Sequence, residues 1–270
     1  MTYFGFLARF LIIPLLVLLG ITAWDLRQGN FHPPWPVQRA VWLAIGLHIL
    51  LALVYTTPWD NYLVATKVWS YKDSLVSGLL IGWVPLEEYL FFVLETLLTG
   101  LWWWLLERHS PAPAHFHTSK KLRLLALVLA GLFWLAALFI LVFRWVPGSY
   151  LALILIWALP AIAPQLAFGA DILWQRRRLL ALTVLPLFFY FSLADAFAIA
   201  SGTWRINPNQ STALLLGPLP VEEALFFGVT VTLISFGLTL ALSHLSRARW
   251  QSWLVSNLPK KTNNQNTNRF

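Results

Sequence analysis

The stretch 79–92, LLIGWVPLEEYLFF, returns 135 residues later as 214–227, LLLGPLPVEEALFF. The same shift aligns the residues before it, so that 13 of the 38 positions from 55 to 92 are identical to their counterparts. A leucine-rich composition produces chance matches of Leu, but it does not readily align several acids, a Pro, a Gly and a Trp. The chain therefore contains an internal repeat. Its identical pairs include Asp60/Asp195, Trp69/Trp204, Gly82/Gly217 and Pro85/Pro220.

The composition is that of an integral membrane protein. Of the 270 residues, 59% are hydrophobic and 11% charged, and the mean hydropathy is +0.67. Because a spanning helix needs roughly 20 mostly apolar residues, we predict seven spans. They cover about Phe4–Trp24, Val37–Thr56, Leu75–Leu106, Leu122–Phe143, Val146–Phe168, Leu179–Ala200 and Thr212–Leu242. The first lacks a basic start and a small-residue cleavage site, so we expect a retained helix.

The repeat organises these spans. It equates the second span with the sixth, the third with the seventh and, most nearly, the first with the fifth. The fourth has no counterpart and returns the chain to its starting side, so we predict two parallel three-helix repeats joined by a linking helix. The predicted units are repeat one (1–107), a cytoplasmic loop and linking helix (108–145), repeat two (146–243) and a basic, polar tail (244–270).

The formal net charge of +8 reflects topology and does not indicate nucleic-acid binding. With seven spans, 14 of the 19 basic residues fall on one side of the membrane and four on the other, with Arg9 at the start of the first span. The positive-inside rule then places the C-terminus in the cytoplasm and the N-terminus outside the cell membrane. We expect the Asn-rich tail from about Ser256 to be disordered.

Acidic residues inside apolar segments are the candidates for chemistry. Burying a carboxylate in a span costs roughly 2.5–3.5 kcal/mol. The adjacent pairs Glu87–Glu88 and Glu222–Glu223 must therefore have a role that offsets this cost. Pro85 disfavours helix before it, which predicts a kinked or discontinuous helix with the pair in its first turns after the break. Repulsion and burial would leave one Glu of each pair as an acid and the other as a base. The alternative is an ordinary helix start, where Glu is favoured by the helix dipole.

The residues around these pairs have competing interpretations. Helical spacing places aromatic rings beside the carboxyls, namely Phe91, Phe92, Phe226 and Phe227. Asp60 and Asp195 would lie just outside a helix end as caps or interface anchors, with a substrate-binding role as the alternative. Trp69 and Trp204 fit an aromatic belt at the membrane surface.

Missing features exclude several classes of protein. The absence of Cys excludes disulfides, thiolate metal sites and cysteine nucleophiles. No GxGxxG or phosphate loop is present, which argues against a dinucleotide or nucleotide site. All Lys lie in loops or the tail, which excludes a retinal protein with a Schiff-base lysine in its last span. His48 has no acid or second His at ligand spacing on its helix, so we predict neither a metal site nor a cofactor.

The doubled motif, PLEEYLFF (85–92) and PVEEALFF (220–227), resembles that of the membrane-integral lycopene cyclases of the heterodimeric type, here with both halves in one chain. Each copy begins 25 residues after an Asp and 16 after a Trp. The resemblance extends to about Leu242. It implies cofactor-independent cyclisation of the ψ-ends of lycopene to β-rings, giving β-carotene through γ-carotene, and it implies that the catalytic acids are Glu87, Glu88, Glu222 and Glu223. Spacing alone does not distinguish a β-ring from an ε-ring product.

The chemistry of such a reaction suits these residues. A terminal double bond is protonated, the ring closes through a tertiary carbocation, and a ring proton is removed. An acid, a base and aromatic faces for the cation are required. The substrate would enter the site from the lipid. The resemblance also implies that the protein forms a complex with other carotenoid enzymes. Two alternative functions are a transporter with proton-coupling carboxylates and a noncatalytic scaffold that binds a carotenoid or a quinone.

Overall fold

The fold is an all-α membrane bundle. The computed structural model describes residues 1–28, 35–110 and 117–257, and within them seven helices are long and apolar enough to cross a membrane. The prediction of seven spans is therefore confirmed. The helices of the bundle are α1 (Tyr3–Leu7), the π-helix η1 (Ala8–Ile12) and α2 (Ile13–Arg27), which form the first span, then α3 (Trp35–Ala65), α4 (Leu86–Arg108), α5 (Lys120–Val142), α6 (Ser149–Gln175), α7 (Arg177–Ala200) and α8 (Val221–Leu242).

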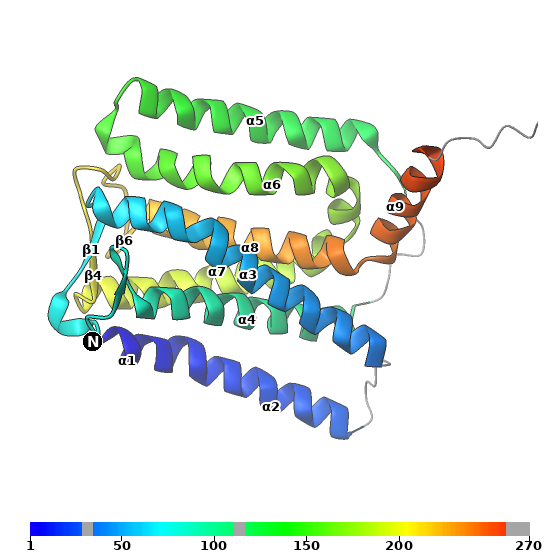
Figure 1. Cartoon of the computed structure of the whole chain (residues 1–270), viewed down its shortest axis with the longest axis horizontal. Coiled ribbons are helices and arrows are strands. Elements are labelled where there is room, and N and C mark those ends of the chain that lie inside the picture. The colour runs from blue at the N-terminus through cyan, green and yellow to red at the C-terminus, as the bar shows by residue number, and fades with distance from the viewer. Residues whose placement is uncertain (29–34, 111–116, 258–270) are drawn as a thin grey trace, which may run out of the picture.

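Short strands and turns connect these helices. Figure 1 shows the labelled strands β1, β4 and β6 at the end of the bundle that also holds the N-terminus, while α9 (His244–Asn257) lies at the opposite end. Consecutive spans run in opposite directions, so both repeats point the same way. The connecting elements are β1 (Trp69–Tyr71), η2 (Asp73–Leu75), β2 (Leu80–Ile81), β3 (Val84–Pro85), η3 (Val146–Gly148), β4 (Trp204–Ile206), β5 (Leu215–Leu216) and β6 (Leu219–Pro220).

An antiparallel ladder joins the two repeats. β1 pairs with β4, with Ser70 opposite Arg205 at the centre and Trp69 opposite Ile206. Ser70 and Arg205 are themselves 135 residues apart, so the ladder is centred on equivalent positions. Glu95 and Thr230, another pair with this spacing, share a hydrogen bond of 2.8 Å. The repeats thus meet around a pseudo-twofold axis.

The sequence prediction for the third and seventh spans was partly wrong. Instead of a kinked helix beginning at Leu75, the chain forms a small hairpin from β2 and β3, and α4 begins only after Pro85. The second repeat forms the same hairpin from β5 and β6, and α8 begins after Pro220. Pro lacks the N–H that a helix interior requires, but its fixed φ suits the residue before a helix. The expected break is therefore present, with a hairpin on its N-terminal side.

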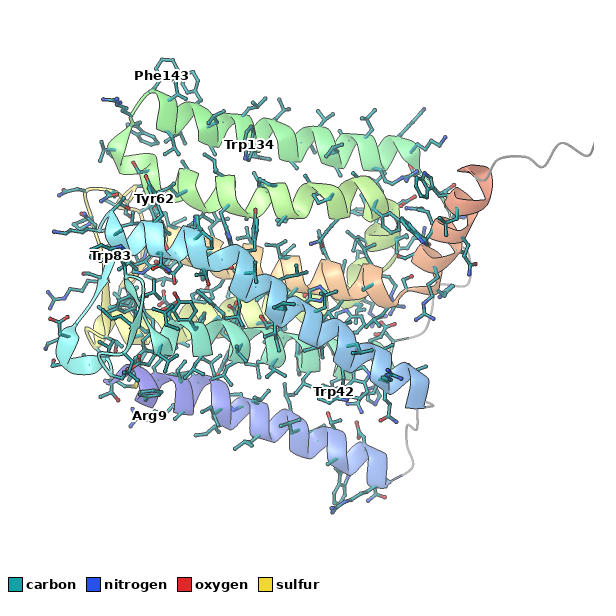
Figure 2. The ribbon with its side chains drawn as sticks, viewed as in Figure 1. Arg9, Trp42, Tyr62, Trp83, Trp134 and Phe143 are labelled. Atoms are coloured by element: carbon teal, nitrogen blue, oxygen red, sulfur yellow. The ribbon has the colours of Figure 1, made fainter. Side chains whose placement is uncertain are left out.

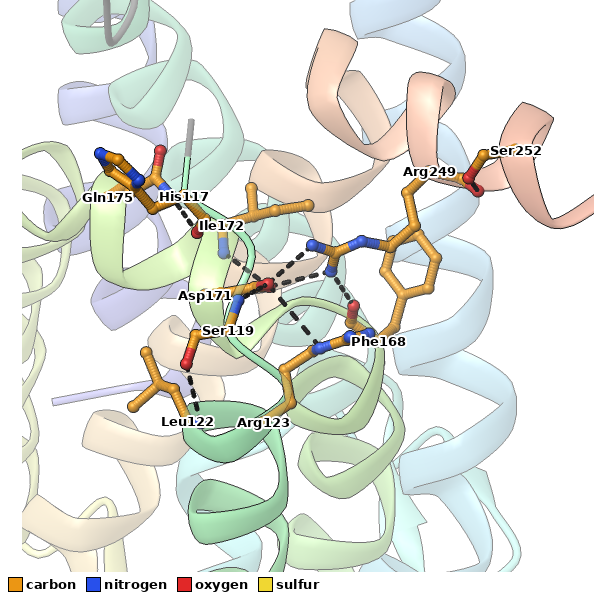
Figure 3. A network of polar contacts seen from close by, with 10 residues as sticks. All are labelled: His117, Ser119, Leu122, Arg123, Phe168, Asp171, Ile172, Gln175, Arg249 and Ser252. Carbon is orange, nitrogen blue, oxygen red and sulfur yellow. Dashed lines mark hydrogen bonds and ion pairs between the residues drawn. The ribbon is translucent and has the colours of Figure 1, made fainter. Parts of the chain in front are cut away.

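The basic tail contains a helix that the sequence analysis missed. α9 (His244–Asn257) packs against the ends of α6 and α8. Its Arg249 donates to both carboxylate oxygens of Asp171 at 2.9 and 2.7 Å, and Arg123 lies 3.7 Å from the same group (Figure 3). Asp171 also accepts from the Ser119 N–H at 2.9 Å. One buried carboxylate therefore ties together α5, α6 and α9. The Asn-rich segment predicted to be disordered lies almost entirely beyond the described residues.

Aromatic residues mark the outside of the bundle. In Figure 2, Trp83 and Phe143 lie toward the end that carries the strands, and Trp42 lies toward the other end. Trp83 and Phe143 are each 66% exposed. Such residues suit the boundary between lipid and water.

Candidate active site

A small cavity at the pseudo-twofold axis collects four carboxyl groups, one pair from each repeat. They belong to Asp60 on α3, Glu88 on α4, Asp195 on α7 and Glu223 on α8. We call it the acid cavity. Asp60, Asp195 and Glu223 are buried and Glu88 is half-buried, and no basic side chain is among the described residues that line the cavity. Among the described residues, no group of three or more His, Asp or Glu side chains is arranged as a metal site.

Glu88 is held by two tyrosines. Tyr3, in the first turn of the first span, donates its hydroxyl to Glu88 Oε2 at 2.6 Å, and Tyr71 on β1 donates to the same oxygen at 2.8 Å. Burial, together with the charge of Glu88, raises the pKa of Tyr71 well above its usual value. The phenol therefore stays protonated and remains a donor. Two donors on one oxygen favour the carboxylate form of Glu88.

The second repeat holds Glu223 in a related way. Tyr150, in the first turn of α6, donates to Glu223 Oε1 at 2.7 Å. Asp195 lines the cavity together with Glu223, and its Oδ1 accepts a 2.8 Å hydrogen bond from the Trp204 indole. Tyr71 has no counterpart, because Ile206 occupies its position in β4. The two halves of the cavity are therefore similar in outline but chemically different.

Asp60 and Asp195 lie inside helices, so their predicted position just outside a helix end was wrong. Asp60 is on α3 and Asp195 is on α7, and their exposed fractions are 0% and 1%. Neither Asp60 carboxyl oxygen has a hydrogen-bond partner among the described residues. A buried carboxyl without donors around it is held in the neutral form, because ionisation there is costly.

Glu87 and Glu222 point away from the acid cavity and hold the hairpins. Glu87 accepts from the N–H and the hydroxyl of Ser77 at 2.5 and 3.0 Å. Glu222 accepts from the Thr212 N–H at 2.6 Å and from the Ser211 hydroxyl at 3.2 Å. Each carboxylate thus fastens the loop before its hairpin to the first turn of the following helix. The motif Pro-x-Glu-Glu combines one loop-anchoring Glu with one cavity Glu.

Aromatic rings form the walls of the acid cavity. The four predicted Phe residues all line it, and Phe91 approaches Phe227 across the axis with ring centroids 6.1 Å apart. Trp59 stacks on Phe226 at 5.8 Å with nearly parallel rings. Trp69 and Trp204 also line the cavity, so their assignment to a membrane-surface belt was wrong. The full set of aromatic lining residues is Tyr3, Trp59, Trp69, Tyr71, Phe91, Phe92, Tyr150, Trp204, Phe226 and Phe227.

Sequence reasoning missed the tyrosines that hold the two cavity glutamates. Tyr3 and Tyr150 are equivalent in space but 147 residues apart, 12 more than the shift that aligns the motifs. A second alignment of the first and fifth spans could have paired them. That signal is weak, because few other identities accompany it.

The cavity has the groups that protonation and deprotonation of a hydrocarbon require. It offers a neutral carboxyl, carboxyls held by donors, and ring faces that stabilise a passing cation. Its volume of about 40 Å³ leaves little space for water. A carbocation formed here would be protected from hydration.

Known proteins with similar sequences identify the family of this chain. The chain is 40% identical over 247 residues to a lycopene beta-cyclase of Halobacterium salinarum, an alignment that covers 88% of this chain and 94% of the relative. It is 33% identical over 245 residues to a bifunctional lycopene cyclase/phytoene synthase of Podospora anserina, covering 87% of this chain and 39% of that longer protein. No protein-family model and no solved structure matches the chain. By its similarity to the Halobacterium protein over nearly the whole of both chains, the protein belongs to the lycopene beta-cyclase family.

Proposed function

We propose that this protein cyclises the ψ-ends of lycopene to β-rings by acid–base chemistry, without a cofactor of its own. The observation that carries the proposal is the acid cavity, in which four carboxyls from two repeats, three of them buried and one half-buried, face aromatic walls. The family relationship supplies the substrate class. The product has the formula of the substrate, so the reaction is an isomerisation and the protein is an intramolecular lyase or isomerase.

Asp60 is the proposed proton donor. Its carboxyl is fully buried and lacks hydrogen-bond partners among the described residues, which keeps the proton on it until substrate arrives. Transfer of this proton to the terminal double bond leaves a tertiary carbocation. The neighbouring double bond attacks that cation, the ring closes, and the positive charge moves to a ring carbon. Ring faces such as those of Trp59, Phe91 and Phe226 stabilise the cation along this path.

Glu88 is the proposed base. Tyr3 and Tyr71 favour its carboxylate form, which removes a ring proton and leaves the ring double bond. Return of the proton from Glu88 to Asp60 within the same cavity restores the starting state. Glu223 and Asp195 line the same cavity and are proposed to supply polar contacts and a second route for the proton. Glu87 and Glu222, also expected as catalytic acids, serve in this proposal to anchor the hairpins.

The proposed function is tested by expressing the protein in a bacterial host that accumulates lycopene and separating the extracted pigments. Wild type should give cyclic isomers of unchanged mass. The Glu88→Gln substitution should lower the rate of cyclisation about 100-fold or more, because proton transfer by a positioned group contributes at least that factor. The matched control is the adjacent Glu87→Gln, which should cyclise lycopene at a near-normal rate per folded molecule but unfold more easily. Unchanged lycopene with well-inserted wild-type protein would contradict the proposal.

The assignment of the acid is tested by comparing Asp60→Asn with Asp195→Asn. Asparagine keeps the size of the side chain, but its amide has no acidic proton that it could transfer to the substrate. The Asp60 variant should lose cyclisation by about 100-fold or more, while the Asp195 variant should retain a measurable part because Glu223 remains beside it. Equal losses in the two variants, or a larger loss in the Asp195 variant, would move the acid to the second repeat.

The orientation of the protein and its partners are also part of the proposal. We infer an N-terminus outside and a C-terminus in the cytoplasm, because the basic residues concentrate at the end of the bundle that carries α9. The substrate is dissolved in the bilayer. Association with other carotenoid enzymes is supported by the Podospora relative, whose name joins a lycopene cyclase and a phytoene synthase in one chain.

A further inference from the structure

A second and larger cavity lies beside the acid cavity. It has a volume of about 270 Å³ and is bounded by α3, α4, α6 and α8. We call it the apolar cavity, because most of its lining is aliphatic or aromatic. Phe92 and Phe226 line both cavities and form the partition between them. The volume is close to the lower end of the range for small-molecule sites.

Two polar side chains of the apolar cavity, Glu95 and His48, are hydrogen-bonded within the protein, whereas Gln165 Oε1 and the Trp157 indole N–H have no hydrogen-bond partner among the described residues. Glu95 accepts a hydrogen bond from the Thr230 hydroxyl at 2.8 Å. The His48 ring is hydrogen-bonded through Nδ1 to the Ala44 carbonyl oxygen at 2.7 Å. These contacts reduce the polarity that the walls present to a ligand. A hydrocarbon therefore suits this cavity better than a polar solute.

A groove on the outside of the bundle borders the apolar cavity, and the Tyr55 hydroxyl, which donates to the Trp157 carbonyl oxygen at 2.7 Å, lies between the two spaces. It runs between α3 and α6, and both spaces are lined by Leu51, Tyr55 and Trp157. Leu51 is 53% exposed and Val54, in the groove, is 65% exposed. In a membrane these side chains face lipid. The groove therefore brings a lipid-facing surface against the Tyr55–Trp157 wall of the apolar cavity.

The equivalent place in the other half of the molecule is filled. The counterparts of Ala52 and Thr56, which line the apolar cavity, are the larger residues Leu187 and Phe191. Leu187 is 7% exposed and Phe191 is 2% exposed, and the Phe191 ring stacks on Phe227 at 5.8 Å. The larger side chains Leu187 and Phe191 therefore fill the space in the second half, while the smaller Ala52 and Thr56 leave the cavity open in the first. The pseudo-twofold symmetry does not extend to the cavity.

The apolar cavity lies along the same face of α3 as Asp60, the proposed acid. Ala52, Thr56 and Asp60 follow one another at intervals of four residues in α3, so they lie on one face of that helix. Ala52 and Thr56 line the apolar cavity and Asp60 lines the acid cavity. A long molecule lying along this face therefore points its end at the Asp60 carboxyl.

We propose that the apolar cavity and its groove hold the polyene chain of the carotenoid, which enters from the lipid between α3 and α6. This inference rests on the proposed function. The two repeats then build one active site with a single entrance, and not one site each. Only one end of the substrate reaches the carboxyls at a time. A product with two rings requires the monocyclic carotenoid to leave and re-enter in the opposite direction.

Cavity-filling variants test this inference with purified protein and lycopene in liposomes. Thr56→Phe copies the residue that fills the other half, and Ala161→Phe fills the cavity from its α6 wall. Each should lower the initial rate of cyclisation by about tenfold or more, because the added ring occupies space the substrate needs. The matched controls are Ala136→Phe on α5 and Ala181→Phe on α7, both on exposed faces, which should keep the wild-type rate.

The outcomes separate the two proposals. Wild-type protein that leaves lycopene unchanged would overturn the proposed function. Active wild type together with folded, fully active Thr56→Phe and Ala161→Phe variants would overturn the cavity assignment alone. If Thr56→Phe fails to insert, Ala161→Phe decides, since it tests the same space from another helix. With lycopene in excess, free monocyclic product should precede the dicyclic one, and a dicyclic first product would overturn the single entrance.

Discussion

At the scale of single residues, Tyr71 is the clearest difference between the two halves of the acid cavity. It adds a second donor to Glu88, while the equivalent Ile206 offers none to Glu223. It also accepts a hydrogen bond from the Trp69 indole at 3.1 Å. The phenol thus orients the proposed base and is itself held in place.

Replacing this phenol tests its positioning role. Tyr71→Phe should lower the rate of cyclisation by about tenfold, since a hydrogen bond to a charged group is worth about 1.5–3 kcal/mol and Tyr3 still donates to Glu88. The rate should be measured per inserted molecule at several pH values. Weaker stabilisation of the carboxylate should shift the rising limb of the profile to higher pH. The control is Tyr62→Phe on the exposed surface of α3. A lower rate with an unchanged pH profile would indicate a structural role only.

The acids of the site were partly predictable from the sequence. The cost of burying charge identified the Glu pairs, and the structure places Glu88 and Glu223 in the cavity. The sequence alone did not distinguish Glu88 and Glu223 from Glu87 and Glu222. Neighbouring residues in a first helical turn point in different directions, and only the folded loop shows which of them faces Ser77 or Thr212. Tyr3 and Tyr150 were missed because the stretch from Tyr3 to Asp60 is 12 residues longer than the stretch from Tyr150 to Asp195, so the 135-residue shift does not align the first and fifth spans.

At the scale of elements, the docking of α9 depends on one buried carboxylate. Asp171, at 2% exposure, contacts Arg249 of α9 and Arg123 of α5, and hydrogen bonds of the Arg249 side chain also reach the Phe168 carbonyl. Arg249 and Arg123 both pair with this one carboxylate, so the ion-pair network and the docked helix stabilise each other. The sequence predicted a polar tail here because the apolar stretch ends at Leu242 and α9 has few apolar residues of its own.

The substitution Asp171→Asn should therefore release α9. It removes the charge that pairs with two arginines and should destabilise the docked helix by about 3–5 kcal/mol, the cost of breaking a buried ion pair. Limited proteolysis of the membrane-inserted protein should cut within 244–257 much faster than in wild type. Asp73→Asn, at an exposed position of η2, is the control. An unchanged cleavage rate would mean that apolar packing on α6 and α8 is sufficient to hold α9.

At the scale of the whole molecule, the absence of Cys makes orientation measurable with single labels. Ser74→Cys lies on an exposed loop at the end with the strands, and Ser252→Cys lies on exposed α9 at the other end. If the N-terminus is outside, a membrane-impermeant thiol reagent added to intact cells should label position 74 and not 252. Opening the cells should make both reactive. The reverse pattern would contradict the orientation that the basic residues predict.

The overall architecture was more predictable than the site, for a physical reason. Membrane spans follow from length and hydropathy alone, and the 135-residue repeat fixed which spans correspond. The hairpins before α4 and α8 were not predicted, because Leu79–Ile81 and Leu214–Leu216 are as apolar as a span. Only Gly82 and Gly217, both with positive φ, mark the tight turns.

The ladder between β1 and β4 has a meaning for the history of the chain. Rotation about its centre at Ser70 and Arg205 exchanges equivalent positions, which is the geometry by which two identical subunits associate. An ancestral gene for a single repeat could have used the same contact as a homodimer. Fusing two such genes in tandem requires one additional crossing to keep the copies parallel, and α5 supplies it with only Ala130 and Ala137 buried along its length. Duplication then freed each copy to diverge, one toward an open cavity and the other toward a filled one.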